Sequence, residues 1–476
     1  MPLSSPRPEH GFGASFRRLT AAVLFATLVP RLAQRGLFLD GLTYAAIARN
    51  LAIGQGHVWA PSYTATLYPV FYEHPPLAFW LQSLWFRALG DHAFVERIYA
   101  ATTAIVTVVV LALTWRRVQR ADPFAREYDW LPALFWVAVP VVSWSVVGNM
   151  LETTMALFSS AAILAFAVAL DSSVLGGIVA GLASGLCVGC AFLSKGPVGL
   201  FPLAAPVVFA FVPRPGRRVW AGWVGQWGAA LACGLLLLAA AGPRASLAHY
   251  VQQQVLASVA GQRETSGSSL TIVRVLFEGV WLPMAGAYAV AVWAARTVVR
   301  PSAATWREAG AWTALGLAGT LPILLSSKQT GHYLVPAVPC FAIAAAMLAR
   351  PTVAAALAAK VAHRRRLIEC TSLAIVIAAV AAAWLPALER DGQRIRDLDA
   401  IANVVPQGTT LGICPATMGD WGLHAWFERR FRVSLGVHAQ SAWFLKTRDA
   451  PAGCVPAFCR PITNPDGALV LMTCRS

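Results

Sequence analysis

Apolar residues fill the chain in runs that approach the length of a membrane-spanning helix. Eleven such runs alternate with polar segments between residues 19 and 387. A helix of about 20 apolar residues crosses the hydrocarbon core of a bilayer. The pattern therefore predicts an α-helical integral membrane protein with about eleven transmembrane helices. The expected spans are 19–36, 94–115, 130–148, 150–170, 174–194, 197–212, 219–242, 276–295, 309–326, 332–349 and 367–387.

Clusters of arginine lie on connections that share one side of the expected membrane. They precede the first span and follow the second, sixth, eighth and tenth. Cytoplasmic loops are enriched in Lys and Arg, which predicts a cytoplasmic N-terminus. An odd number of spans then places the C-terminal tail on the other side. The clusters are Arg17–Arg18, Arg116–Arg126, Arg214–Arg218, Arg296–Arg307 and Arg350–Arg366.

Three polar segments lie on the side away from these clusters. The first loop has helical spacing of apolar residues over Leu42–Ile53 and Leu77–Leu89, which predicts two interfacial helices. The second, Pro243–Arg274, is rich in Gln, Ser and Gly and is expected to be a mobile loop. The tail alternates apolar runs with Pro/Gly turns, which indicates a small α/β domain. The chain thus divides into a membrane domain, 1–387, and a tail domain, 388–476.

Composition supports the membrane class and excludes nucleic-acid binding. The chain is 57% hydrophobic and 13% charged, whereas soluble proteins are about 25% charged. The net charge of +16 comes from the arginine clusters between apolar runs. No Lys/Arg-rich face with interleaved aromatic residues is present, so we expect no nucleic-acid partner.

The nine cysteines fall into two groups. Five lie in apolar runs, where we interpret them as small packing residues, including the CxxC pair Cys187 and Cys190. The other four are in the tail. An even number of tail cysteines predicts disulfides, involving Cys454 or Cys459, in an oxidising compartment. Three pairings are compatible with the four tail residues, which are Cys414, Cys454, Cys459 and Cys474.

Scarce charged residues gather on the side of the membrane that lacks the arginine clusters. The chain has only four lysines, and Lys195 and Lys328 lie on this side against the usual charge bias. Asp40 and Glu73, which is followed by a rigid Pro-Pro pair, lie there too, and Glu152 opens the fourth span. Lysines can bind a phosphate, and a carboxylate can activate a hydroxyl. These residues predict one site for a phosphate-bearing lipid.

Each residue also has a structural interpretation. A lysine near a helix end can extend to the interface, and Asp40 can cap the helix that follows it. Glu73 can accept a hydrogen bond from a backbone N–H at the corner of the loop, and Glu152 can form an ion pair with a nearby arginine. His74, His249 and His332 can be packed or solvated side chains. The joint presence of the charged residues on one side favours the site.

Five motifs resemble those of a bacterial membrane family related to dolichyl-phosphate-mannose protein mannosyltransferases and aminoarabinose lipid A transferases, the glycosyltransferase family 39 type. The family often has other residues at three places: a glutamate where Gly41 follows Asp40, a lysine where His74 follows Glu73, and an aspartate where Glu152 enters the fourth span. The matching positions are Asp40 with Tyr44 and Arg49, Glu73–Leu77, Gly90 with Arg97, Lys195–Pro197, and Ser326, Lys328, Tyr333 and Pro336.

The resemblance implies a GT-C-type fold and transfer of a sugar from a polyprenyl (undecaprenyl) phosphate donor. The acceptor would be a lipid, glycan or protein at the periplasmic face of a bacterial inner membrane. Asp40 and Glu73 are the expected catalytic residues, and the resemblance allows a divalent metal ion between them. The expected donor-phosphate ligands are Lys195, Lys328 and Tyr333, and the further candidates are Glu152, Arg49, His74 and His249.

Two other functions fit a polytopic protein of this composition. A translocator of lipid-linked sugars would carry charged residues at mid-span depth, whereas here they lie at span ends. A membrane scaffold with a partner-binding tail would tolerate replacement of Glu73, Lys195 and Lys328.

Overall fold

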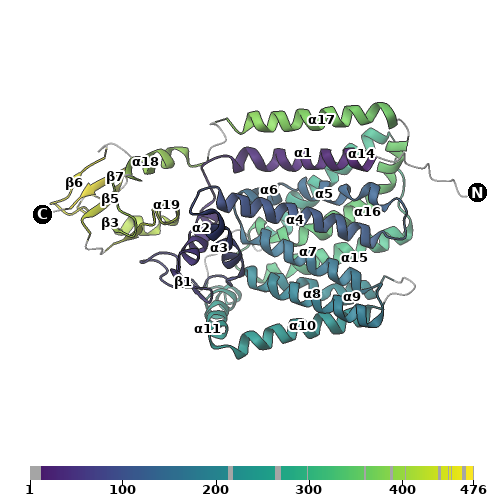
Figure 1. The fold of residues 1–476 in the computed structure, drawn as a ribbon, viewed down its shortest axis with the longest axis horizontal. Coiled ribbons are helices and arrows are strands. Elements are labelled where there is room, and N and C mark those ends of the chain that lie inside the picture. Colours follow the sequence, from purple (N-terminus) through teal and green to yellow (C-terminus); the bar gives the residue numbers. More distant parts are fainter. Residues whose placement is uncertain are drawn as a thin grey trace, which may run out of the picture.

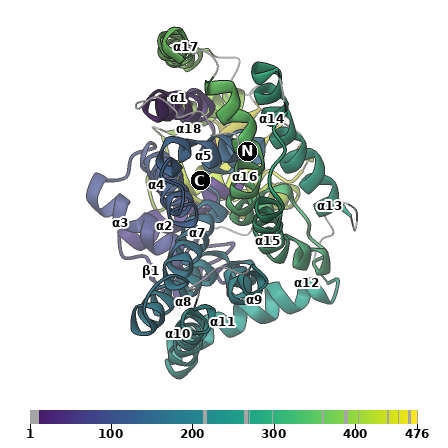
Figure 2. The same ribbon diagram turned by 90° about the vertical axis from the view of Figure 1, so that its right-hand side faces the viewer.

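The apolar runs form a bundle of long helices, and the polar tail forms a module at one end of that bundle (Figure 1). The computed structural model describes residues 12–212, 218–262, 268, 270–296, 298–358, 361–385, 390–402, 404–437, 441–448, 450–451, 453–463 and 468–474. Viewed along the bundle, α7 and α16 lie inside, and α10 and α17 lie at the periphery (Figure 2). The bundle helices are α1 (Phe12–Leu32), α4 (Val95–Val118), α5 (Trp130–Val137), α6 (Pro140–Val147), α7 (Leu151–Ala169), α8 (Val174–Lys195), α9 (Ala205–Ala210), α10 (Val219–Ala239), α13 (Thr271–Val275), α14 (Leu282–Ala295), α15 (Ala303–Thr320), α16 (Val338–Ala358) and α17 (Val361–Ala382).

Within the described residues, eight helices are long and apolar enough to cross a membrane, and a ninth span arises if α5 and α6 are counted together. These two helices meet at 75° because Pro140 begins α6 and holds Val139 in an extended conformation. All eleven expected segments contain helix, but the count of eleven spans is not confirmed. Pro197–Ala210 is short, and α17 begins within an arginine cluster. The chain is a multi-pass membrane protein.

The helix ends that carry the described arginines of these clusters, such as the start of α1 and the end of α4, lie at one end of the bundle, opposite the tail module (Figure 1). Asp129 is only 1% exposed and accepts ion pairs from Arg17 and Arg116. Asp171 pairs with Arg120 at 3.0 Å. This arrangement agrees with the expected alternation of the spans; which end faces the cytoplasm stays a prediction.

Helices of the connecting loops cover the other end of the bundle. The two expected interfacial helices are present as α2 (Leu39–Ala52) and α3 (Leu77–Leu89). The expectation of a loop after Pro243 is wrong for its first part, where α11 (Ala241–Tyr250), a wide helical turn (Val251–Leu256) and α12 (Ala257–Val259) follow one another. Buried Leu247 and Tyr250 give α11 an apolar side that packs inward. Residues 263–267 and 269 of that loop lie outside the described part. The first loop also holds a short hairpin, β1 (Gly56–His57) and β2 (Ala60–Pro61).

The tail is the expected small α/β module. Its five-stranded sheet has the order β4-β3-β5-β7-β6, with β3 parallel to β4 and β5 and with β7 antiparallel to β5 and β6. Leu37, just before α2, and Leu42, in the first turn of α2, join the buried core of this module. Its elements are α18 (Gly392–Ala402), β3 (Thr410–Ile413), α19 (Trp421–Phe431), β4 (Ser434–Gly436), β5 (Trp443–Thr447), β6 (Arg460–Pro461) and β7 (Leu469–Thr473).

A buried ion-pair network docks α19 of the module onto the loop helices. The Arg49 guanidinium, 1% exposed on α2, donates to the Glu428 carboxylate at 3.0 Å and to its backbone carbonyl at 2.9 Å. Arg429 pairs with Asp91 at 2.7 Å and with Glu96 at 2.8 Å. Burial lowers the pKa of Arg49 and raises the pKa of Glu428, so each group depends on the other to remain charged.

Two disulfides join the four tail cysteines. Cys414 pairs with Cys454, and Cys459 pairs with Cys474. The expectation of tail disulfides is confirmed, and one of the three open pairings is selected. The first bridge connects the end of β3 to a loop 40 residues later.

We expect peptide mapping under non-reducing conditions to find the linkages Cys414–Cys454 and Cys459–Cys474 in protein purified from membranes. Closing a loop of this length typically stabilises a small domain by about 2–4 kcal/mol. Cys414→Ser/Cys454→Ser should therefore lower the unfolding temperature of the module, with Cys370→Ser, an exposed free thiol, as the control. Four free tail thiols in the native protein would contradict the structure.

Replacement of Arg49 by Met should cost about 3–5 kcal/mol of unfolding free energy, because Glu428 remains buried without its partner. The double variant Arg49→Met/Glu428→Met leaves no unpaired charge and should recover much of that loss. Arg396→Met, on the exposed side of α18, is the matched control. Thermal unfolding and protease release of the tail measure the effect; a double variant weaker than Arg49→Met would refute the pairing.

Candidate functional site

A cavity of about 510 Å³ opens between the bundle and the loop helices. Its walls are mostly apolar, and its charged and polar groups are contributed by α7, α8, the first loop, the segment from α11 to α12 and the segment after α15. It is therefore suited to a ligand with a long apolar part and a small polar group. Those of its lining residues that carry polar groups are Glu73, His74, Glu152, Lys195, Tyr250, Gln254, Ser258, Ser326 and Tyr333.

An ion pair lies in the wall of this cavity. The Lys195 ammonium, at the C-terminal end of α8, donates to Glu152 Oε1 at 2.5 Å. Glu152 stands in the first turn of α7. Each of the two charges is therefore opposite in sign to the partial charge of its own helix end, which stabilises it. The second oxygen of Glu152 is buried without a hydrogen bond among the described residues. The Lys195 ammonium also lies 5.1 Å from the centre of the Tyr333 ring.

The Lys-Gly-Pro sequence fixes where α8 ends. Gly196 has φ +112°, a conformation that side chains other than glycine rarely adopt. A Cβ at this position would lie 1.9 Å from the Tyr250 hydroxyl. That hydroxyl donates to the Lys195 backbone carbonyl at 3.1 Å. Glycine is thus required for α11 to approach α8 and hold Lys195 at the cavity.

Asp40 lies beside the cavity on the first turn of α2. Its carboxylate is half-buried and forms no hydrogen bond or ion pair with any residue that the structure describes, yet it is close enough to influence Lys195 and His332. Gly41 allows this position, since a Cβ there would lie 2.0 Å from the Gly148 carbonyl oxygen. The glycine after Asp40 is therefore explained by close packing of α2 on the end of α6.

Two side chains of the first loop are held by tyrosines. The Tyr68 hydroxyl donates to Glu73 Oε1 at 2.9 Å, and the Tyr44 hydroxyl lies 3.2 Å from His74 Nε2. Tyr44 is buried in α2. Burial, and after it the charge of Asp40, raises the pKa of Tyr44 well above its usual value, so its hydroxyl stays protonated and can donate to a ligand or to His74.

An aromatic contact links Asp40 to the ion pair. Trp144 stacks on His332 with ring centres 5.5 Å apart, and Phe38 lies edge-on to Trp144 at 4.8 Å. His332 Nε2 lies 3.5 Å from Glu152 Oε1. The rings fill the space between α2 and the start of α7, which keeps Asp40 and Glu152 in one environment.

The structure brings together most of the residues expected from the sequence. Lys195, Glu73, Glu152, His74 and Tyr333 line the cavity. Glu152 pairs with this lysine, not with the arginine that its structural interpretation supposed.

Lys328 lies beside the cavity, where its charge influences His332 and its backbone N–H donates to the Ser326 hydroxyl at 3.2 Å. Arg49 and His249 are not brought to the cavity. Arg49 is held by Glu428, and His249 is exposed and stacks on Tyr72 at 4.8 Å.

A metal ion between Asp40 and Glu73 finds no third protein ligand among the described residues. Among the described residues, no group of three or more His, Cys, Asp and Glu side chains is placed to hold a metal ion. His249, the candidate third ligand to Asp40 and Glu73, faces solvent instead. No metal-dependent step is derived for this chain.

Three residues that contact the site residues were not predicted from the sequence. Tyr68 lies in the first loop outside the motifs, Tyr250 lies in the segment expected to be a loop, and Trp144 lies in the expected span 130–148. The paired aromatic residues of the first loop could have suggested Tyr68, because a hydroxyl five residues before Glu73 can reach it across a turn.

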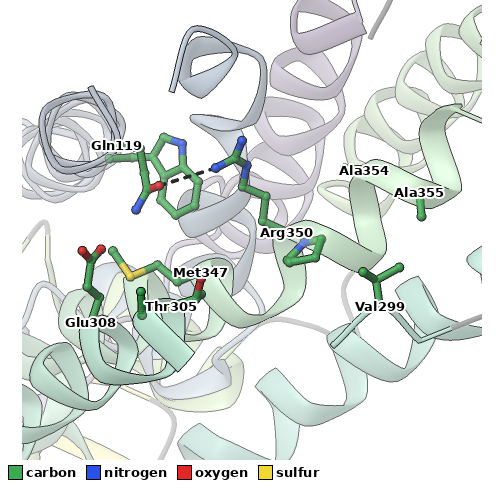
Figure 3. A pocket seen from close by; sticks show the side chains of 11 residues that line it. Gln119, Val299, Thr305, Glu308, Met347, Arg350, Ala354 and Ala355 are labelled. Carbon is green, nitrogen blue, oxygen red and sulfur yellow. Dashed lines mark hydrogen bonds between the residues drawn. The ribbon is translucent and has the colours of Figure 1, made fainter. Parts of the chain in front are cut away.

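A second cavity of about 570 Å³ lies at the arginine-rich end of the bundle (Figure 3). Arg350 donates to Gln119 there at 3.5 Å, Met347 lies on the same helix as Arg350, α16, and Glu308 lies on α15. Arg350 is already paired with Asp122. None of the expected site residues lines this cavity, so it is not the candidate functional site.

Gly196→Ala should destabilise the protein by about 1–3 kcal/mol through overpacking against Tyr250 and should displace Lys195. Gly234→Ala is the control, because no atom lies within 4 Å of a Cβ at that position on α10. Thermal unfolding in detergent measures both. Equal unfolding temperatures for the two variants would show that Tyr250 does not pack on Gly196.

Comparison with known proteins agrees with the fold. Residues 73–242 match the family described as dolichyl-phosphate-mannose-protein mannosyltransferase. The chain is similar over 98% of its length to ArnT from Cupriavidus metallidurans in the apo state, with 18% identity, 98% of that chain covered and a TM-score of 0.68. The crystal structure of that ArnT bound to undecaprenyl phosphate gives 17% identity, 98% of this chain and 99% of that one covered, and a TM-score of 0.66. No curated protein sequence matches the chain. Taken with the arrangement of the bundle, the loop helices and the tail module, these matches show that the chain has the GT-C glycosyltransferase fold.

Proposed function

We propose that this protein transfers a sugar from a polyprenyl phosphate donor to an acceptor hydroxyl or phosphate at the membrane face where the tail module lies. The observation that carries the proposal is the Lys195–Glu152 ion pair in the wall of an apolar cavity. A cation fixed beside an apolar channel matches a ligand that is a lipid along most of its length and a phosphate at one end.

The donor phosphate would bind at Lys195, with Tyr333 beside it and Lys328 at the margin of the cavity. Glu152 holds the lysine in place and keeps its charge balanced before the donor arrives. The ring of Tyr333 flanks the ammonium at 5.1 Å. The first isoprene units would lie along the apolar wall that Val198, Leu200 and Phe201 contribute.

Transfer breaks the bond between the sugar C1 and the phosphate oxygen, and the leaving phosphate keeps the electron pair. The acceptor oxygen forms the new bond to C1 and releases its proton, where it has one, to a carboxylate. Asp40 is our first choice for this base because its carboxylate has no other described partner, and Glu73 is the next. The positive charge of Lys195 stabilises the phosphate as it departs.

Similar proteins support this class of donor. The ArnT crystal structure that matches the fold contains undecaprenyl phosphate. We infer from this and from the charge pattern that the protein lies in a bacterial inner membrane with the cavity facing the periplasm. The sugar and the acceptor, which can be a lipid, a glycan or a protein, are not specified by the residues at the site.

The position of the charges favours a transferase over a translocator or a scaffold. Lys195 ends α8 and Glu152 begins α7, so both lie at helix ends and not at mid-span. A translocator moves charge through the membrane centre, where charged side chains are costly. A scaffold has no need for buried charges at a cavity.

The test follows release of undecaprenyl phosphate, because this product forms whichever acceptor takes the sugar. Purified protein in liposomes receives undecaprenyl-phosphate-linked sugars, separately a hexose and an aminopentose, together with a heat-treated total membrane extract that contains lipid, glycan and protein acceptors. Wild-type protein should release undecaprenyl phosphate from at least one donor. A wild-type protein that released none from either donor, in extracts from several bacteria, would overturn the proposal.

Asp40→Asn, Glu73→Gln and the double variant Lys195→Met/Glu152→Gln should each lower the rate about 10²–10³-fold, since each removes charge used in the transition state. The double variant leaves no unpaired buried charge and so keeps the protein folded. Arg307→Ala is the control: it is exposed on the first turns of α15, about 16 Å along the helix at 1.5 Å per residue from Ala318, which lines the cavity. Near-wild-type rates in the three variants, or an equal loss in the control, would refute the roles assigned here.

A further inference from the structure

The Glu73 carboxylate is hydrogen-bonded to Tyr68, and the tail module contacts Tyr68. The Tyr68 hydroxyl donates to Glu73 Oε1 at 2.9 Å. The Tyr68 ring in turn stacks on the ring of Trp421, the first residue of α19, with ring centres 6.1 Å apart. A carboxylate that lines the cavity is thus connected by two aromatic side chains to a domain more than 340 residues later in the sequence.

The module also holds the backbone around Tyr68. The Ala65 N–H donates to the Ser434 hydroxyl at 2.9 Å, and the Thr66 hydroxyl donates to the Leu435 carbonyl at 2.6 Å. Both partners lie on β4, at the edge of the module's sheet. Within the loop, the Tyr63 N–H donates to the Tyr68 carbonyl at 3.0 Å. The segment that precedes Glu73 is therefore attached to the module at both backbone and side chain.

We propose that Tyr68 and Trp421 are positioning residues for Glu73, so that the docked tail module completes the active site. This inference rests on the proposed transferase function. Neither residue lines the cavity, so neither is expected to touch the substrate. They act by limiting the orientations of the Glu73 carboxylate, because a misplacement of about 1 Å at a reacting group can cost up to 10² in rate.

The same module restrains the other carboxylate. Arg49 lies on α2 two turns after Asp40, and its guanidinium is bound by Glu428 of α19. Trp421 and Glu428 lie seven residues apart on α19, which places them on one side of that helix. One face of α19 therefore contacts both the helix that carries Asp40 and the loop that carries Glu73.

Tyr68→Phe removes a single hydroxyl and keeps the ring that stacks on Trp421. We expect it to lower kcat about 10- to 100-fold while KM for the undecaprenyl-phosphate-linked sugar stays within about twofold, since no donor contact is lost. Trp421→Ala should lower kcat by a similar factor, and Trp421→Phe should restore most of it by keeping a stacked ring. Phe458→Ala is the control, an exposed aromatic residue of the same module. A rise in KM with unchanged kcat would overturn the positioning role.

A double-variant cycle separates positioning from a general effect on stability. If Trp421 acts through Tyr68, then Trp421→Ala should lower kcat by no more than about twofold when Tyr68→Phe is already present. Independent roles would give losses that multiply. Multiplied losses would overturn the proposed connection.

Hydrogen exchange gives a readout that does not depend on sugar transfer. In Trp421→Ala the backbone amides of residues 61–76 should exchange faster than in wild-type protein, whereas in Phe458→Ala they should not change. If wild-type protein transfers no sugar, the proposed function fails, but faster exchange still supports positioning of the loop by the module. Unchanged exchange in Trp421→Ala would overturn the positioning proposal, whatever the activity.

Discussion

A lysine and a glutamate buried at the ends of two membrane helices must neutralise each other, and the candidate site is arranged around this requirement. The side chains of Lys195 and Glu152 are 10% and 2% exposed, and an isolated charge so placed costs several kcal/mol. Their distance of 2.5 Å fixes the end of α8 against the start of α7. Gly196 follows from that position, because the chain must turn sharply where Tyr250 packs. The pair keeps one cation at the cavity without a ligand.

Local signals account for what the sequence predicted of the fold. Each apolar run contains helix, and the helix Leu77–Leu89 ends as expected before Gly90, which has φ +81°. Composition did not predict α11, because nearly all of the Gln, Ser and Gly residues that indicated a loop lie after this helix, beyond Tyr250. Ion pairs between residues far apart in the sequence could not be predicted from the sequence. Arg49 and Glu428 are 379 residues apart, and no local pattern marks an arginine as the partner of a distant glutamate.

Scarcity explains which site residues the sequence revealed. The chain contains only four lysines, so a lysine on the side without basic clusters stands out, and Lys195 does line the cavity. Arginine is abundant here, and Arg49 carried a motif match but serves to dock the tail module. Tyr68 did not stand out because aromatic residues are ordinary at a membrane interface, and Trp421 lies far away in the sequence, in the tail. Their contact exists only once the module is folded.

The two parts of the protein meet different physical demands. On the proposed function the bundle admits a long apolar chain, and its part of the cavity wall is mostly apolar, with its charges Lys195 and Glu152 paired to each other. The carboxylates proposed to act on the acceptor, Asp40 and Glu73, need a fixed orientation that a loop alone would not give. The tail module is a sheet held by two disulfides. Its helix α19 restrains α2 through the Arg49–Glu428 ion pair and the first loop through the Tyr68–Trp421 stack. On this reasoning, the tail belongs to the site as much as the membrane helices do.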